Sequence, residues 1–163
     1  MHWRSMTTLD LPAVEAIAEK VHPAFPEDLS VFIERQRLYP DGSRVLELDG
    51  VASGYVVAHP WRYKSLPALN SQLGAIPPDA DTFYLHDLAL LPIARGTGAA
   101  AMIVGELLRH ARAMGFPTVS LVAVNNSLPF WHKHGFRPVV APELADKLRS
   151  YEDAARLMSR SLV

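Results

Sequence analysis

Two features in the middle of the chain could do chemistry: His86, and a few residues later the run Arg-Gly-Thr-Gly-Ala-Ala-Ala at 95–101. A free imidazole titrates near neutral pH, so His86 suits a general base that takes a proton from a substrate. The glycine-bearing run suits an anion, because glycines let a ligand approach the backbone and Arg95 adds positive charge at the rim. Proton transfer next to a bound anion is therefore the chemistry that these residues indicate.

A helix that follows the glycines would complete the anion site. Six apolar residues at three-and-four spacing predict an amphipathic helix over 97–114: Ala100, Ile103, Val104, Leu107, Leu108 and Ala111. The first N–H groups of a helix lack partners inside it, and the helix dipole adds partial positive charge there. Residues 95–101 therefore predict a pyrophosphate cradle. A glycine-rich turn without any ligand has the same composition, and that alternative stays open.

Two familiar phosphate loops do not match this run. A Walker A loop needs a lysine after its last glycine, and none follows Gly98. A dinucleotide fingerprint needs a third glycine near a first strand, whereas alanines follow Gly98 and the run lies beyond mid-chain. The run instead resembles Arg/Gln-x-x-Gly-x-Gly/Ala, the acyl-CoA pyrophosphate loop of the GNAT (GCN5-related N-acetyltransferase) superfamily, with Arg95, Gly98 and Ala100 at its defined positions.

A second segment strengthens this resemblance. Residues 125–136, Asn-Asn-Ser-Leu-Pro-Phe-Trp-His-Lys-His-Gly-Phe, are similar to the superfamily's Asn…Phe-Tyr-x-Lys-x-Gly-Phe. One departure matters, because Trp131 stands where the superfamily often has a tyrosine that protonates the leaving thiolate. An indole N–H is a donor and not an acid in this range. The thiolate therefore leaves unprotonated, or takes its proton from water, His132 or another group.

The elements that must position these residues follow from apolar periodicity, prolines and glycines. The first predicted strand ends at 6–8, and the others span 44–48, 51–58, 82–91, 118–123, 136–140 and 156–162. The first predicted helix is capped by Asp10, the second begins near Leu29 and is stopped by Pro40, and the others span 97–114, 127–134 and 143–149. Asp49-Gly50 predicts a tight hairpin. The order of these elements resembles the GNAT order over nearly the whole chain. The resemblance implies an α/β (α+β) fold, with a mixed, mostly antiparallel sheet of about seven strands splayed between strands 4 and 5, about four helices, and a single domain over 1–163.

The resemblance also implies how the chain holds acetyl-CoA. The pantetheine arm would pair with the backbone of Leu88 and Leu90, with Ala89 between them, and the N–H of Leu90 would be the catalytic oxyanion donor. Asn125 or Asn126 would reach the pantetheine amides; the spacing leaves the choice open. The full set implied for the cosubstrate is Leu88, Ala89, Leu90, Arg95, Gly96, Thr97, Gly98, Ala99, Ala100, Ala101, Asn125, Asn126, Phe130 and Lys133.

His86 is the candidate catalytic base of this strand. Tyr84 shares its face by alternation, and Asp87 is expected on the opposite face. Tyr-Leu-His-Asp-Leu-Ala-Leu at 84–90 also resembles the histidine-bearing strand of arylalkylamine N-acetyltransferase, whose histidines help deprotonate the amine. The competing interpretation is a histidine in the pocket wall, with water carrying the proton.

A proline-rich connection at 59–81 would supply the acceptor wall. Connections this long inside a domain are usually functional, and a helical turn is expected within it at 66–73. Trp61 and Tyr63, together with Tyr84, would bind an amine substrate by cation–π contact. Ordinary packing of this loop against the sheet is the alternative.

Composition limits the remaining classes. The 163 residues carry a net charge of −1 and 49% hydrophobic residues, which favours a globular protein without a nucleic-acid partner. There are no cysteines, no metal site is expected, and no apolar run suggests a leader or a membrane span, so we expect a cytoplasmic protein. A homodimer stays open.

The function predicted from these features is N-acetylation. The acetyl group of acetyl-CoA, the one cosubstrate expected, would move to a primary amine by direct attack, with a small-molecule acceptor favoured. The alternatives are a non-catalytic acyl-CoA-binding module and an acetyltransferase for protein N-termini or lysines.

Overall fold

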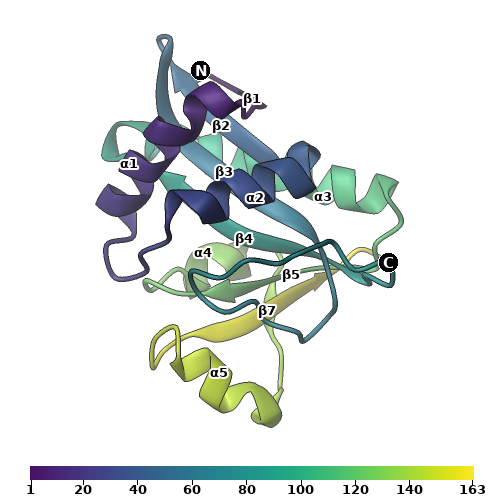
Figure 1. Ribbon diagram of the computed structural model, residues 1–163. Helices are drawn as coiled ribbons and strands as arrows, with labels where there is room; N and C mark the ends of the chain where they lie inside the picture. Colours follow the sequence, from purple (N-terminus) through teal and green to yellow (C-terminus); the bar gives the residue numbers. More distant parts are fainter.

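The computed structural model describes residues 1–163 and consists of one seven-stranded sheet with helices on both faces (Figure 1). The strands, in the spatial order β1-β2-β3-β4-β5-β7-β6, are β1 His2–Ser5, β2 Ser43–Leu48, β3 Val51–Trp61, β4 Thr82–Leu90, β5 Thr118–Ala123, β7 Arg156–Ser161 and β6 Arg137–Pro138. The helices are α1 Leu11–Val21, α2 Leu29–Leu38, α3 Ala99–Ala113, α4 Leu128–Lys133 and α5 Ala145–Arg149. All strand pairs are antiparallel except β4 and β5.

Alternating residues of β3 and β4 divide the core into two layers. Tyr55 and Val57 pack on one face of the sheet with apolar residues of α1 and α2, whereas Val56 and Ala58 pack on the other face with α3 and Trp131 of α4. This alternation is the period of two expected for a strand that is buried on both sides. The central strands are thereby fixed in register.

The parallel contact between β4 and β5 is short. Only Phe83 pairs with Val119 and Tyr84 with Ser120, so the two strands separate beyond Tyr84. On its other edge, β4 stays paired with β3, and the Leu91 N–H donates to the Ser53 carbonyl. Backbone groups alternate between the two edges of a strand, so those of Leu88 and Leu90 face the opening. The splay predicted between strands 4 and 5 is confirmed.

The hairpin and most element positions are also as predicted. Asp49 and Gly50 both have positive φ, 50° and 76°, which is the conformation that a tight two-residue hairpin requires. The structure has five helices rather than about four. None of them has the length and the apolar composition needed to cross a membrane.

Two expectations about the secondary structure were wrong. The first strand does not include Met6–Thr8; it ends at Ser5, and Thr8–Asp10 form a 3₁₀ turn because the Asp10 carboxylate accepts the Thr7 N–H and is held by Arg4. No helical turn forms at 66–73. The backbone there bonds to α2 instead, where Glu34 accepts the N–H groups of Leu73 and Gly74.

Candidate functional site

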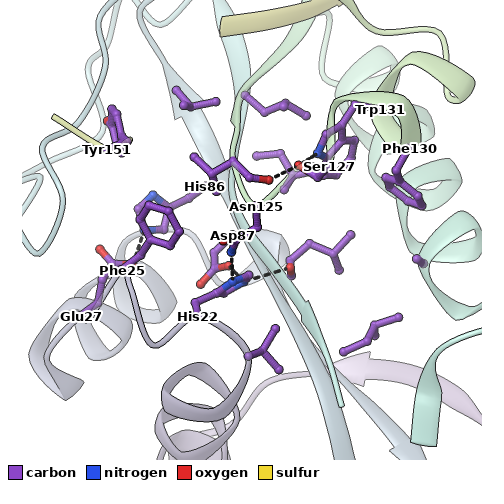
Figure 2. A pocket seen from close by; sticks show the side chains of 18 of the residues that line it. His22, Phe25, Glu27, His86, Asp87, Asn125, Ser127, Phe130, Trp131 and Tyr151 are labelled. Atoms are coloured by element: carbon purple, nitrogen blue, oxygen red, sulfur yellow. Dashed lines mark hydrogen bonds and ion pairs between the residues drawn. The ribbon is translucent and has the colours of Figure 1, made fainter. Parts of the chain in front are cut away.

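A cavity of about 420 Å³ follows the opening between β4 and β5 (Figure 2). At one end it reaches the loop before α3, and we call this the glycine end: Leu90, Arg95, Gly96, Ala100 and Phe130. At the other end it reaches the first half of β4, and we call this the aromatic end: Phe25, Glu27, Leu69, Tyr84 and Tyr151. His22, His86, Asp87, Leu88 and Asn125 line the middle. One continuous space therefore joins the two ends of β4.

The glycine end fits a pyrophosphate. Gly96 and Gly98 have φ of 75° and 85°, a backbone conformation that suits glycine, and no other atoms crowd either Cα. Gly98 precedes the first turn of α3, where Thr97 Oγ1 accepts the Ala99 N–H at 3.3 Å. The N–H groups of Ala100 and Ala101 belong to the same first turn, so no helical carbonyl pairs with them. These donors and the exposed Arg95 suit an anion.

A β-bulge in β4 shapes the middle of the cavity. Val57 pairs with Asp87 and Ala58 with Leu85, so His86 is an extra residue without a partner on β3. The bulge interrupts the alternation of the strand, and His86 and Asp87 both contact the connection that follows α1. Our expectation that Asp87 lies on the opposite face was wrong for this reason.

His86 forms a closed pair with Glu27, which lies in the connection between α1 and α2. His86 Nε2 is 2.8 Å from Glu27 Oε1, and each side chain is only 6% exposed. Burial alone would raise the pKa of Glu27, but the charge of His86 and its hydrogen bond outweigh burial and lower it. An ionised Glu27 accepts a hydrogen from Nε2 and leaves Nδ1 of His86 as the nitrogen that can receive a proton.

His22 forms a second pair with Asp87 (Figure 2). His22 follows the last residue of α1, and its Nε2 lies 3.0 Å from Asp87 Oδ1 and 3.4 Å from the Leu88 carbonyl oxygen. Its Nδ1 lies 3.1 Å from Nδ2 of Asn125, which follows β5. The ring therefore bridges the opening between the two strands. Asp87 also accepts a hydrogen bond from the Tyr55 hydroxyl.

The charges of this second pair reinforce each other. Burial would lower the pKa of His22, but its hydrogen bond to Asp87 and the charge of that carboxylate outweigh burial and raise it. Burial would raise the pKa of Asp87, but His22, His86 and the Tyr55 hydroxyl together lower it. An imidazolium beside a carboxylate is therefore favoured at this position.

Burial moves the pKa values of three other titratable groups near the cavity away from neutral pH. Burial raises the pKa of Tyr84 well above its usual range, and burial raises that of Tyr151 to about 12. His59 lies behind the cavity wall, where burial lowers its pKa to about 3. The two histidine–carboxylate pairs are thus the groups suited to proton transfer.

Half of the residues singled out in the sequence lie in this cavity. Those that line it are Tyr84, His86, Leu88, Leu90, Arg95, Gly96, Ala100, Asn125 and Phe130. Those that do not are Trp61, Tyr63, Ala89, Thr97, Gly98, Ala99, Ala101, Asn126 and Lys133. Asn125, rather than Asn126, contacts His22, and the buried Ala89 packs toward α1 and α2.

Trp61 and Tyr63, the two aromatic residues expected in the acceptor wall, lie outside the cavity because of the path of the chain. Strand β3 continues to Trp61, which stacks edge-on against His59 behind the cavity. The Tyr63 N–H donates to Asp81, which fixes the start of the connection away from the opening. Leu69 is the residue of this connection that reaches the cavity.

Sequence reasoning missed His22, Glu27, Phe25, Leu69 and Tyr151. No local pattern marks them, because each comes from a connection whose path depends on tertiary packing. Trp131, at the position where the family often has a tyrosine, has its indole N–H 3.2 Å from Ser127 Oγ, and His132 is exposed and outside the cavity.

Comparisons with known proteins agree with this geometry. Residues 4–136 match the model of the acetyltransferase (GNAT) family. Similar solved structures include the GphF GNAT-like decarboxylase in complex with isobutyryl-CoA (TM-score 0.79, 19% identity, 100% of both chains covered) and Ard1 from Thermoplasma volcanium (TM-score 0.75, 16% identity, 99% of this chain and 97% of that one). Rv2747 from Mycobacterium tuberculosis, in complex with CoA and NLQ, is a further one (TM-score 0.70, 18% identity, 100% of both chains).

Curated proteins gave no match. The solved structures share the fold at low identity, whereas the family model covers most of the sequence and includes the glycine loop, the bulged strand and helix α4. The chain therefore belongs to the acetyltransferase (GNAT) family.

Proposed function

We propose that this protein is an N-acetyltransferase that moves the acetyl group of acetyl-CoA to the primary amine of a small molecule. One observation carries the proposal: a single cavity connects an anion-binding helix start to a buried histidine–carboxylate pair. Acyl transfer by direct attack needs these two functions at the two ends of one space, because the donor and the amine must meet between them.

Each part of the chain has a role in this reaction. The first turn of α3 and Arg95 bind the pyrophosphate, and the backbone of Leu88 and Leu90 pairs with the pantetheine arm. His86 takes a proton from the attacking amine through Nδ1, while Glu27 holds Nε2 and thus the orientation of the ring. The nitrogen then forms a bond to the acetyl carbon as the carbon–sulfur bond breaks. The N–H of Leu90 is the proposed donor to the oxyanion.

The aromatic end supports a small acceptor. The Tyr151 hydroxyl donates to the Pro67 carbonyl and ties the segment before β7 to the long connection beside the cavity. Leu69 and Phe25 add apolar surface, and the ionised Glu27 attracts a cation. A small amine with an apolar body suits this end, because its ammonium group would enter beside Glu27. A peptide needs an open groove, and this tie narrows the approach.

A panel of acceptors tests the proposal. The protein is mixed with acetyl-CoA and primary amines of graded size, with peptides that carry free N-termini or lysines in parallel, and free CoA is measured with a thiol reagent. We expect release of CoA with small amines. Release with peptides alone would replace the small-molecule acceptor by a protein acceptor. Binding of acetyl-CoA without CoA release for any acceptor would indicate a non-catalytic acyl-CoA-binding module.

A further inference from the structure

The reaction needs a proton donor that Trp131 does not supply. When the carbon–sulfur bond breaks, its electron pair stays on sulfur, and a thiolate at neutral pH favours protonation because an ordinary thiol titrates near 8.5. The indole N–H of Trp131 is not acidic in this range, and it points to Ser127 Oγ within its own helix. Another group close to the thioester sulfur in the cavity would have to give this proton.

His22 lies close to that position. An acyl-CoA arm that enters from the glycine end and pairs with Leu90 and Leu88 brings its thioester to the next residues of β4, which are Asp87 and His86. The His22 ring is held at this level, with Nε2 at 3.0 Å from Asp87 Oδ1 and at 3.4 Å from the Leu88 carbonyl oxygen. The leaving sulfur and the imidazole would therefore meet in the middle of the cavity.

A contact across the opening lies beside this position. His22 Nδ1 and Asn125 Nδ2 are 3.1 Å apart (Figure 2). When His22 is neutral with its hydrogen on Nε2, Nδ1 accepts this hydrogen bond from Asn125. When His22 is charged, Nδ1 is itself a donor, and an anion beside the two nitrogens can accept from both. A thiolate is an anion of this kind.

The surrounding charges favour the protonated form of His22. The charged groups that face it are Asp87 on β4 and Glu27 in the connection after α1; Asp87 also touches Tyr55 on β3, and His86 lies beyond it. Burial works against the charge, but Asp87 outweighs it and the pKa of His22 is raised. The pair thus favours the imidazolium form of His22.

We propose that His22 is the general acid of this protein and that Asp87 positions it. The proton passes from the His22 imidazolium to the sulfur as the carbon–sulfur bond breaks, which gives CoA thiol and neutral imidazole. His86 meanwhile holds the proton taken from the amine. In each turnover the protein therefore gains one proton at His86 and gives one from His22. The inference rests on the proposed function, since it assigns a step of that same transfer.

The thiol of bound CoA offers a test that needs no acceptor. The ultraviolet absorption of the thiolate is followed against pH with saturating CoA, and desulfo-CoA is the blank. An imidazolium beside the sulfur stabilises the thiolate, so the bound thiol should ionise at lower pH than free CoA. His22→Gln should abolish this shift. His132→Gln, a change of the same type at an exposed histidine outside the cavity, should retain it.

Kinetics give the second readout. With an active amine, His22→Gln should lower kcat by about 10²-fold, as expected for loss of a positioned acid, with unchanged affinity for desulfo-CoA in calorimetry. The variant should also lose the basic limb of the pH profile. The same thiol titration curve in wild type and His22→Gln would overturn the assignment. No CoA release from the wild type with any amine would instead count against the proposed function, and the thiol titration would still decide the role of His22.

Discussion

The two histidine–carboxylate pairs of the cavity are built from the same two segments, but the segment that supplies the histidine differs between them. In one pair, β4 supplies the histidine, His86, and the connection after α1 supplies the carboxylate, Glu27. In the other pair, β4 supplies the carboxylate, Asp87, and the same connection after α1 supplies the histidine, His22. The same two segments therefore meet twice with their roles exchanged, and this happens because the bulge turns two successive residues of β4 to one side.

The pairs differ in exposure and in their further partners. Both side chains of the His86–Glu27 pair are 6% exposed, and no other group bonds to that imidazole. The side chains of His22 and Asp87 are 18% and 14% exposed, and His22 also contacts Asn125 across the opening. The closed pair suits a base at the aromatic end, where the amine enters. The more open pair suits an acid beside the path of the thioester.

The largest effect should follow from breaking the closed pair. His86→Ala removes the proposed base, and a positioned base typically contributes ~10²–10⁴-fold, so kcat should fall by an amount in that range. Steady-state kinetics with a saturating amine measures this loss. Calorimetry with CoA should show unchanged affinity, because the glycine end is untouched.

The amine itself needs a control, because its own deprotonation can imitate an enzyme base. Two acceptors of different pKa are therefore compared in wild type and His86→Ala. If the acidic limb follows the pKa of the acceptor in both proteins and kcat stays within a few-fold of wild type, His86 is a wall residue and water carries the proton.

A change at the glycine end should weaken donor binding and leave both pairs intact. Gly98→Asp places a carboxylate before the first turn of α3, where it repels a pyrophosphate, and we expect about tenfold weaker CoA binding or more. Gly50→Asp in the β2–β3 hairpin is the matched control, since it introduces the same residue at a similar positive φ in open space. Undiminished CoA affinity in Gly98→Asp would show that the pyrophosphate does not bind at residues 95–101.

A smaller effect should separate the aromatic end from the region behind it. Leu69→Ala removes apolar surface from the cavity and should raise the KM for the amine about fivefold, equivalent to ~1 kcal/mol of lost contact. Trp61→Ala changes a residue behind the wall and should alter this KM less. A larger change of KM in Trp61→Ala than in Leu69→Ala would contradict this. It would indicate that the acceptor binds near Trp61 at the start of the connection, as the sequence alone predicted.

Much of the fold could be predicted because its signals are local. The spacing of apolar residues marks α3, Asp49-Gly50 marks the hairpin, and the glycines at 96 and 98 mark a turn that the chain enters with positive φ. These features depend on neighbours in the sequence, so a single sequence reveals them. The order of elements then resembles a known family, and the splay between β4 and β5 follows from that fold.

The proton-transfer site depends on contacts that no local pattern records. Strict alternation placed Asp87 on the wrong face, because one extra residue in β4 is enough to shift the side chains that follow it. Glu27 and His86 lie 59 positions apart in the chain, and their contact depends on the path of the connection after α1. The sequence shows that the expected tyrosine is absent at position 131, but nothing in it points from that absence to His22.

The most direct test of the two-pair account is the pH dependence of kcat/KM in Glu27→Gln and Asp87→Asn. The neutral amide in Glu27→Gln no longer stabilises a proton on His86, so the acidic limb should move to lower pH, and by more than the basic limb. The amide in Asp87→Asn removes the hydrogen-bonded charge that raises the pKa of His22, so the basic limb should move to lower pH, and by more than the acidic limb. The predicted result is that each variant shifts its own limb more than the other, because Glu27 also faces His22 and Asp87 also faces His86. Equal shifts of both limbs in each variant, or no shift while activity is retained, would contradict it.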